Sequence, residues 1–449
     1  MIRWVLAWAL LQTVSAAGQE SRPAFRAGFA EIDITPPLGT PKQGANSKNV
    51  ATSVLDPLYA RAAIFELGAE RFAILQLDTA QIPAADTRTI RETIAKDHGF
   101  PGDRVMIAAT HNHAGPALIN EALPRDERYV ASLVKKCSEL LGRALEARRE
   151  AQVALGTAFE FGVSFNRRIV MRDGTVRTHG SFKDPRALAF EGPIDPELGV
   201  FAVRGTDGKL LGALVNFACH PTAHWNDGVI SAGFPGVAAR VLKEKGIPIP
   251  MFLQGAAGNM HSQDPRGFPE KSMDEIGKIL ADDVVAALSG LKWTMPEKLS
   301  ASTKTLSLPF RTLSETDLQG TGPGMQRFGE KGYYDRKIPE LLTYMKKGSD
   351  EGEVQVFRID SLAFASQPSE SFAELGLRIK EAAWPTRAWV VCYANGMLGY
   401  LPHEEAFKRG GYECTFGPPS LMAPDAGAKL AEAAIELIRA QGVFSSSRR

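Results

Sequence analysis

The sequence predicts a single large α/β domain with a mixed β-sheet flanked by helices. Its 449 residues are 44% hydrophobic and 23% charged, a composition that can fill a large core. Apolar runs of strand length alternate with longer amphipathic segments along most of the chain. The sequence shows neither internal repeats nor a clear linker, so we expect one domain over residues 24–442.

The order of the elements follows from this alternation. Strands are expected where short runs are apolar, and helices where apolar residues recur every three or four positions. The expected strands are residues 71–80, 103–110, 210–218, 250–254 and 388–394, with a two-stranded hairpin in 353–367. The expected helices are residues 84–96, 125–149, 235–245, 272–288 and 426–440. Residues 310–350, with many Gly, Lys and polar residues, are expected to form a long excursion or lid.

The first residues have the pattern of a secretory signal peptide. Arg3 precedes an apolar stretch over residues 4–14, and residues 14–16 (VSA) resemble a small-residue cleavage site. We therefore expect residues 1–17 to be a signal peptide and the protein to be secreted or periplasmic. An uncleaved anchor lying in the membrane interface is the alternative.

Charge and cysteine content exclude several classes of protein. A net charge of +1 argues against a nucleic-acid-binding surface. No apolar run reaches the roughly 18 residues of a transmembrane helix, while contact with a membrane surface stays open. The cysteines lack a C-x-x-C pair and are too few for a disulfide scaffold, so zero or one bridge is expected. They are Cys137, Cys219, Cys392 and Cys414.

Polar side chains collect directly after the expected strands. They are Asp78, His111, His113, His220, His224, His261, Ser369, Glu370, Asn395 and Tyr400. In open α/β sheets, ligands bind at the carboxyl ends of the strands. Imidazole nitrogens and carboxylate oxygens suit Zn²⁺, and a catalytic zinc keeps one position for water. The pattern therefore predicts a metal site at the carboxyl ends of the strands.

Several of these residues also have a purely structural explanation. Glu370 could stabilise the N-terminus of a helix over residues 371–380, and His224 and His261 could be surface or turn residues. The small-residue turn over 255–258 either lets backbone N–H groups approach a ligand or is a tight connection. The remaining histidines are expected at a helix C-terminus, in a loop and in no assigned element: His98, His179 and His403.

Five segments together resemble the catalytic domain of the neutral (alkaline, non-lysosomal) ceramidase family, from about residue 28 to residue 437. They are GFAEIDITPPLG (28–39), ATHNHAGP (109–116), NFACHPT (216–222), PSESF (368–372) and YANGMLGYLPHEEAFKRGGYE (393–413). By contrast, G-x-S-x-G, Walker A and Rossmann motifs do not occur in the sequence. The resemblance implies a zinc-dependent hydrolase of linear amides, with a small-molecule or lipid-like N-acyl amide as substrate.

The resemblance also implies roles for individual residues. Zinc would be held by His111, His220, Glu370 and Tyr400. The substrate amide would be faced by His113, Tyr412 and Arg167, with the neighbouring Arg168 as the alternative to Arg167. Gly255 and Ala256, in the turn after the strand 250–254, are expected to lie beside the substrate.

Three departures from the family pattern put ceramide itself in doubt. Gly255 stands where the family has an active-site serine, and Gly233 where it usually has an aspartate. The family's C-terminal immunoglobulin-like domain is not expected here. Two alternatives stay open: a barrel-type metal-dependent amidohydrolase, and a non-catalytic secreted binding protein on a degenerate enzyme fold.

Overall fold

The computed structural model describes residues 23–43, 48–120, 122–329 and 331–443. The expected signal peptide, residues 1–17, lies outside these residues. None of the described helices is long and apolar enough to cross a bilayer. All four cysteines are buried and free. Of the two expected numbers of disulfides, zero or one, the structure therefore has zero.

The elements follow one another along the chain largely as the sequence predicts. The longer strands are β1 (Arg26–Asp33), β3 (Tyr59–Leu67), β4 (Glu70–Leu77), β5 (Val105–Ala109), β6 (Arg149–Phe159), β11 (Glu197–Gly205), β12 (Leu210–Phe217), β14 (Pro250–Gln254), β16 (Leu299–Pro309), β17 (Ser349–Ile359), β18 (Leu362–Ser366) and β20 (Arg387–Val391). The short strands are β2 (Ser53–Val54), β7 (Phe165–Asn166), β8 (Arg168–Met171), β9 (Val176–Thr178), β10 (Ala187–Phe190), β13 (Val229–Ile230), β15 (Met260–His261), β19 (Glu370–Ser371) and β21 (Tyr400–Leu401). The helices are α1 (Ala84–His98), α2 (Glu127–Glu146), α3 (Gly233–Glu244), α4 (Met273–Leu288), α5 (Glu315–Gln319), α6 (Lys331–Met345), α7 (Ala373–Ala383), α8 (Glu404–Arg409) and α9 (Ala426–Ala440), with 3-10 turns η1 (Gly102–Arg104) and η2 (Tyr412–Cys414).

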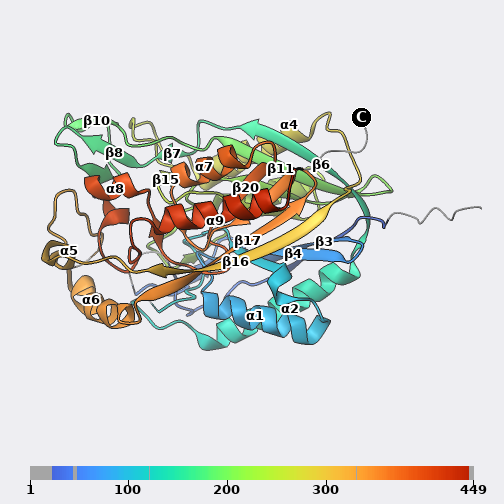
Figure 1. The fold of residues 1–449 in the computed structure, drawn as a ribbon, viewed down its shortest axis with the longest axis horizontal. Helices are drawn as coiled ribbons and strands as arrows, with labels where there is room; N and C mark the ends of the chain where they lie inside the picture. Colours follow the sequence, from blue (N-terminus) through green and yellow to red (C-terminus); the bar gives the residue numbers. More distant parts are fainter. Residues whose placement is uncertain (1–22, 44–47, 121, 330, 444–449) are drawn as a thin grey trace, which may run out of the picture.

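Two stacked β-sheets form the centre of the molecule, and helices cover the outer face of each (Figure 1). The larger sheet has the strand order β14-β12-β11-β6-β1-β3-β4-β5, and the smaller has the order β16-β17-β18-β20. Both are mixed, because β4–β5, β12–β14 and β18–β20 are parallel pairs while their other neighbours are antiparallel. The expected mixed α/β domain is confirmed. Since the larger sheet is open at β14 and β5, the barrel-type amidohydrolase alternative is wrong.

Successive side chains of a strand point to opposite faces of its sheet, and this explains how the sheets and helices form layers. In β4, Ala73 and Leu75 belong to the core under α1 and α2, whereas Phe72 and Ile74 face the smaller sheet. Phe72 stacks on Phe357 of β17, with ring centroids 4.6 Å apart. The helices α3 and α4 cover the other half of the larger sheet, and α7 and α9 cover the smaller sheet. Strands buried on both faces explain the continuous apolar runs in the sequence.

The helix ends follow local capping rules. The Asp126 side chain accepts hydrogen bonds from the first backbone N–H groups of α2. At α4, Ser272 and Glu275 form a reciprocal capping box, and the acidic first turn predicted from Asp274 and Glu275 is confirmed. These caps explain why both helices begin within two residues of the predicted positions.

The main difference from the sequence prediction lies in residues 299–350. They were expected to contain a long excursion, but the structure has β16, α5 and α6 there. β16 pairs with β17 over eleven residues, yet its sequence, LSASTKTLSLP, is mostly polar and lacks an apolar run. Helix α6 contains Pro339 and few buried apolar residues, so its helical period is weak. Tertiary pairing, rather than local pattern, defines this region.

Strands of both sheets end at one place. The Gln254 side chain, at the end of β14, donates to the carbonyls of Thr110 and Cys219 and accepts from the Cys219 N–H. The backbone of Cys392, just after β20, donates to the Gln254 carbonyl. Because this one residue connects the ends of β5, β12, β14 and β20, the segments that follow these strands meet at one edge of the molecule.

Candidate active site and metal centre

Three side chains from different elements converge at this edge. His111 follows β5, His220 follows β12, and Glu370 begins β19. His111 Nε2 lies 2.9 Å from His220 Nε2 and 3.3 Å from Glu370 Oε2, and His220 Nε2 lies 3.4 Å from the same oxygen. All three are buried. Since α7 begins at Ala373, Glu370 lies outside its first turn and its side chain faces the histidines instead.

Backbone carbonyls select the tautomer of both imidazoles. His111 Nδ1 donates to the carbonyl of Ala80 at 2.7 Å, and His220 Nδ1 donates to that of Ala257 at 2.9 Å. Because a carbonyl oxygen can only accept, each Nδ1 carries the proton and each Nε2 presents a lone pair. Metal-binding histidines are held in the same way, with the second ring nitrogen donating to a carbonyl or carboxylate.

This convergence of lone pairs fits a metal ion. The two Nε2 lone pairs and the Glu370 carboxylate face one another, and neither nitrogen brings a proton. Without a cation, the two lone pairs and the carboxylate repel one another. Burial, followed by the neighbouring His111, lowers the pKa of His220 well below its usual value, so His220 does not relieve this repulsion by taking up a proton at neutral pH. A divalent cation binds all three donors at once. The residues present therefore fit a metal.

His113 belongs to the same cluster. Its Nε2 lies 3.0 Å from that of His111, and His111, His113 and His220 have ligand atoms within 4.8 Å of one another. Within the described ranges, this is the one group of three or more potential ligands that lie so close. His111 and His113 do not come together through an extended backbone, because β5 ends at Ala109 and His111 has a φ of 65°.

Left-handed backbone conformations gather around the site. His111, Tyr393 and Asn395 have φ values of 65°, 55° and 63°, which cost roughly 1–3 kcal/mol each in non-glycine residues and are tolerated where surrounding contacts impose them. The Asn395 carboxamide accepts from the Ile107 N–H. Tyr393 stacks on His111 with centroids 3.9 Å apart, and its hydroxyl donates to Glu370 at 3.4 Å. Sequence analysis missed Tyr393, although it opens the YANG segment.

Arg167 faces the site, and Arg168 does not. Arg167 donates to the hydroxyl oxygen of Tyr400 at 3.0 Å and pairs through Nε with Glu413 at 2.9 Å. Arg168 is completely buried between Glu413 and Glu191. Of the two arginines, Arg167 is therefore the one whose guanidinium reaches Tyr400. Glu413 was not predicted, because a carboxylate next to Tyr412 has no sequence pattern that separates it from a surface residue.

Two tyrosines complete the cluster. The parallel pairing of β19 with β21 puts Tyr400 opposite Glu370. Tyr412 lies beside Tyr400, with ring centroids 5.8 Å apart, and its hydroxyl makes no hydrogen bond to any described residue. Burial raises the pKa of Tyr412 well above its usual value, so its hydroxyl keeps its proton at neutral pH. Tyr412 therefore presents a free O–H donor to whatever occupies the site.

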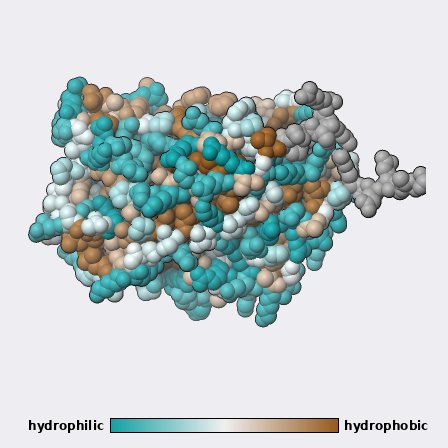
Figure 2. Space-filling view, in the orientation of Figure 1, coloured by the Kyte–Doolittle hydropathy of each residue, from teal (hydrophilic) through white to brown (hydrophobic). Residues whose placement is uncertain are grey.

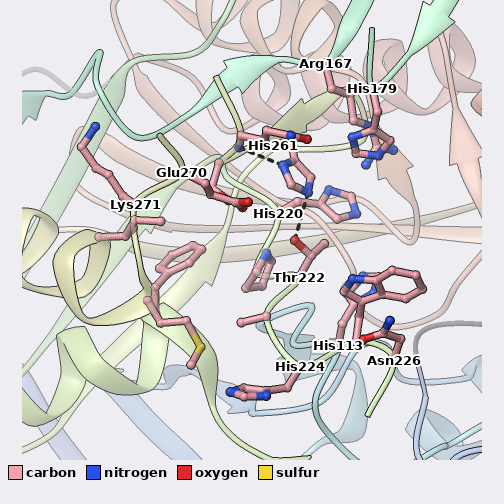
Figure 3. Close-up of a pocket in the computed structure, with 18 of the residues that line it drawn as sticks. His113, Arg167, His179, His220, Thr222, His224, Asn226, His261, Glu270 and Lys271 are labelled. Carbon is pink, nitrogen blue, oxygen red and sulfur yellow. Dashed lines mark hydrogen bonds between the residues drawn. The ribbon is translucent and has the colours of Figure 1, made fainter. Parts of the chain in front are cut away.

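Two cavities meet at the cluster, each close to 1200 Å³. His113, Tyr400 and Tyr412 line both cavities. The first lies on the side of His220 and carries most of the chain's histidines, several of which Figure 3 labels. The second lies on the side of His111 and Glu370. Charged residues line part of it, and apolar residues also line it: Ala80, Pro83, Ile119, Pro368, Met397, Leu398 and Pro419. A substrate with two dissimilar halves fits this arrangement.

Gly255 and Ala256 line neither cavity. A Cβ on Gly255 would lie 2.9 Å from the Cβ of Ala218, and Ala256 packs against Gly376 of α7. This corrects the expectation that both lie beside the substrate. The turn after β14 directs its side-chain positions into the neighbouring strand end and helix, so the missing serine side chain does not widen a substrate cavity.

Other strand-end residues have structural partners. Asp78 is fully buried and pairs with Arg61 at 3.2 Å, away from the metal cluster. His98 ends α1 as predicted, with Nε2 bonded to a carbonyl of α2. His224, expected at the surface, is half-buried, pairs with Asp227 at 2.8 Å and lines the first cavity. His261 and His179 also line that cavity.

Comparison with known proteins adds a family and a fold. The family described as "Neutral/alkaline non-lysosomal ceramidase, N-terminal" matches residues 25–249. A protein of Pseudomonas aeruginosa named "Neutral ceramidase" is 26% identical over 248 residues, which are 53% of this chain and 37% of that relative. This chain therefore covers well under two thirds of the relative's length.

Solved structures show the same fold over nearly the whole chain. The crystal structure of neutral ceramidase from Pseudomonas aeruginosa superposes with a TM-score of 0.74 at 19% identity, covering 95% of this chain and 76% of that one. A structure described as "Ceramidase complexed with C2" superposes with a TM-score of 0.73 at 19% identity, with 95% and 77% covered. At 95% coverage of this chain, the match extends well beyond residue 249.

Proposed function

This chain belongs to the neutral/alkaline non-lysosomal ceramidase family, and on that basis we propose that it is a zinc-dependent hydrolase of N-acyl amides. The observation that carries the proposal is the convergence of His111 Nε2, His220 Nε2 and a Glu370 oxygen, with both Nδ1 protons held by backbone carbonyls. A nitrogen and oxygen donor set of this kind suits zinc. Tyr400 is proposed as the fourth ligand. A bound zinc ion supplies Lewis acidity, which acidifies water and polarises a carbonyl oxygen.

The residues around the cluster have separate tasks in amide cleavage. The Tyr412 O–H donates a hydrogen bond to the carbonyl oxygen as negative charge develops on it. Arg167 holds the phenol oxygen of Tyr400 in place, and Glu413 in turn anchors the guanidinium. His113, which lines both cavities, is placed to carry a proton from the attacking water to the leaving amine nitrogen.

The substrate is proposed to be a small-molecule or lipid-like N-acyl amide, with smaller or more polar amides preferred over long-chain ceramide. Cavities on two sides of the cluster accommodate the acyl and amine halves of such a molecule. The preference rests on the hydrogen-bonding side chains among the residues that line the first cavity, such as Thr222, Asn226 and His261. It does not rest on Gly255, whose side-chain position points at Ala218. The signal-like sequence of residues 1–17 supports export, so the enzyme is proposed to act outside the cytoplasm.

The test measures metal content and turnover together. His111→Ala and His220→Ala are each expected to lose bound zinc, measured by elemental analysis, and to lose activity on a panel of short N-acyl amides and ceramide. His98→Gln is the matched control and should keep both, because His98 ends α1, bonds a carbonyl of α2 and lines neither cavity. Stoichiometric zinc in either alanine variant would show that the ligand set is wrong. A zinc-loaded wild type without turnover on the panel would favour the binding-protein alternative.

A further inference from the structure

A second pair of histidines lies in the first cavity, outside the metal cluster. His179 follows β9 and His261 ends β15, and their rings meet edge to face with centroids 4.8 Å apart (Figure 3). The pairing of His261 with Phe165, two residues before Arg167, brings β15 beside the Arg167 segment. The Arg167 carbonyl accepts from the His179 N–H. The two histidines therefore lie beside the proposed catalytic groups without taking part in the metal cluster.

The hydrogen bonds of this pair leave donors and acceptors available to a ligand. His261 Nδ1 accepts from the Gln263 N–H at 2.9 Å, so the proton resides on Nε2, which donates to Thr222 Oγ1 at 3.0 Å. The Thr222 hydroxyl proton is then free to donate. The ring nitrogens of His179 make no hydrogen bond to the described residues, although this side chain lines the cavity. Its φ of 54° is a left-handed conformation of the kind found at ligand sites.

The pair is electrically neutral. Burial, followed by the positive charge of Arg167, lowers the pKa of His179 to about 4, and burial lowers the pKa of His261 well below its usual value. One donor and one acceptor nitrogen of His179 are thus available at neutral pH without a charge.

The charged groups on the cavity wall have protein partners. Asp227 contacts Lys42 and His224, and Arg167 pairs with Glu413. Glu270 accepts from Ser262, Glu275 caps α4, and Lys271 donates to a backbone carbonyl. The wall therefore offers hydrogen bonds and carries no concentration of one charge sign that would select an ion.

Exposed aromatic faces accompany these polar groups. Trp225 and Phe328 line the same cavity, with 48% and 40% of their surface exposed. The Phe328 ring lies 5.9 Å from that of His179 and 4.7 Å from that of Tyr412. The electron-rich face of an aromatic ring attracts the weakly positive C–H groups of a saturated hydroxylated ring. Exposed aromatics beside neutral hydrogen-bonding groups therefore suit a sugar.

We propose that the first cavity is a subsite for an uncharged, hydroxylated ring, a sugar or cyclic polyol, carried on the amine side of the scissile amide and bound through His179, His261 and Thr222. This inference rests on the proposed function and specifies its substrate class. A second metal site at this pair lacks support, because the described residues place three potential ligands together only at His111, His113 and His220.

The experiment compares four N-octanoyl amides that differ only in the amine: glucosamine, the open-chain diol serinol, glycine and propylamine. With the zinc-loaded full chain, we expect kcat/KM for the glucosamine amide to exceed that for the propylamine amide by about 10-fold or more, the scale of one or two hydrogen bonds. His179→Leu and Trp225→Ala should each lower the ratio of kcat/KM for the glucosamine amide to that for the propylamine amide towards one, measured within the same variant. His179→Asn tolerates the left-handed backbone and keeps a donor and an acceptor, so it should restore part of the preference.

The outcomes distinguish a failure of the proposed sugar subsite from a failure of the proposed hydrolase function. Equal rates for the glucosamine and propylamine amides, or a preference that survives His179→Leu in a folded, zinc-loaded variant, would overturn the inference while leaving the hydrolase intact. The glycine amide as best substrate would overturn the proposal that the ligand is uncharged, and the serinol amide as best substrate would overturn the proposal that it is a ring.

If none of the amides is hydrolysed, the proposed function fails, and ligand-observed NMR with N-acetylglucosamine then tests the subsite. Binding that His179→Leu abolishes supports it, and absence of binding to the wild type overturns it.

Discussion

At the scale of single residues, proton positions decide what the site can do. His111 and His220 each donate from Nδ1 to a backbone carbonyl, which leaves both Nε2 atoms as lone-pair donors. Tyr412 has the complementary property, because its hydroxyl retains a proton and has no hydrogen-bond partner among the described residues. The first set of groups is thus suited to bind a cation, and the second is suited to donate a hydrogen bond to developing negative charge.

This division predicts different effects for two similar substitutions. Tyr412→Phe should lower kcat by about 10²-fold or more with zinc content unchanged, since it removes one donor to the oxyanion. Tyr400→Phe should lower zinc affinity as well as kcat, because the phenol oxygen is proposed as a ligand. Tyr344→Phe, in an exposed residue that lines the second cavity outside the histidine cluster, is the control and should change neither. Normal turnover in Tyr412→Phe with a large loss of thermal stability would assign that ring to packing instead.

At the scale of elements, the turn η2 connects the site to its supporting segments. Glu413 in η2 accepts from Arg167, Arg168 and Thr178, which come from the segment that includes β8 and β9. Burial opposes charge on Glu413, but the two guanidinium groups and the Thr178 hydroxyl outweigh it and lower the pKa of this carboxyl to about 2. The carboxylate thus holds Arg167 in position through an ion pair from which water is excluded.

The depressed pKa predicts a dependence of stability on pH. The pKa of Glu413 in the unfolded chain is near 4.5, so its contribution to stability is present above that pH and is lost as the pH falls towards 2. The contribution is on the order of 3 kcal/mol. Glu413→Gln should be much less stable than the wild type at pH 7, and the difference between the two should shrink from pH 5 to pH 2, measured by chemical denaturation.

The control for this prediction is Glu405→Gln, in an exposed carboxylate of α8 that pairs with Lys408. Its stability should track the wild type across the whole pH range, because exposed ion pairs contribute little. A constant difference between wild type and Glu413→Gln over this range would mean that the buried carboxyl does not change its protonation on unfolding.

At the scale of the whole molecule, the proposed metal site joins the two sheets. His111 and His220 follow strands of the larger sheet, whereas Glu370 and Tyr400 lie beyond strands of the smaller one. Outside this site, Figure 2 shows one face of the molecule covered largely by hydrophilic side chains, with hydrophobic residues in small separate patches. A ligand bound only by the folded state stabilises it in proportion to the logarithm of its concentration over Kd.

Removal of metal should therefore destabilise the whole fold. Dialysis against a chelator is expected to lower Tm by several degrees, and added zinc should restore it, measured by calorimetry. The Tm of His220→Ala should be insensitive to both treatments, which separates this site from adventitious binding elsewhere. An unchanged Tm in the wild type, at zinc concentrations shown to load the protein, would contradict a site that bridges the sheets.

Local pattern was sufficient to predict much of this molecule. Strand 250–254 and helix 426–440 match the structure to the residue, because apolar periodicity and flanking polar residues are properties of short segments. The gathering of His111, His113, His220 and Glu370 was predictable because each follows a strand that ends at the same edge. Resemblance to a family, rather than spacing, supplied the roles expected for Arg167, Tyr400 and Tyr412.

Other features depend on contacts between segments far apart in the chain, which no local pattern encodes. The polar strand β16 becomes a strand only because β17 pairs with it, and the stacking of the second sheet requires Phe72 to meet Phe357. Gly255 faces Ala218, 37 residues earlier, so its role could not be read from the turn that contains it. The tautomers of His111 and His220 depend on carbonyls at Ala80 and Ala257, which only the folded chain brings within hydrogen-bonding distance.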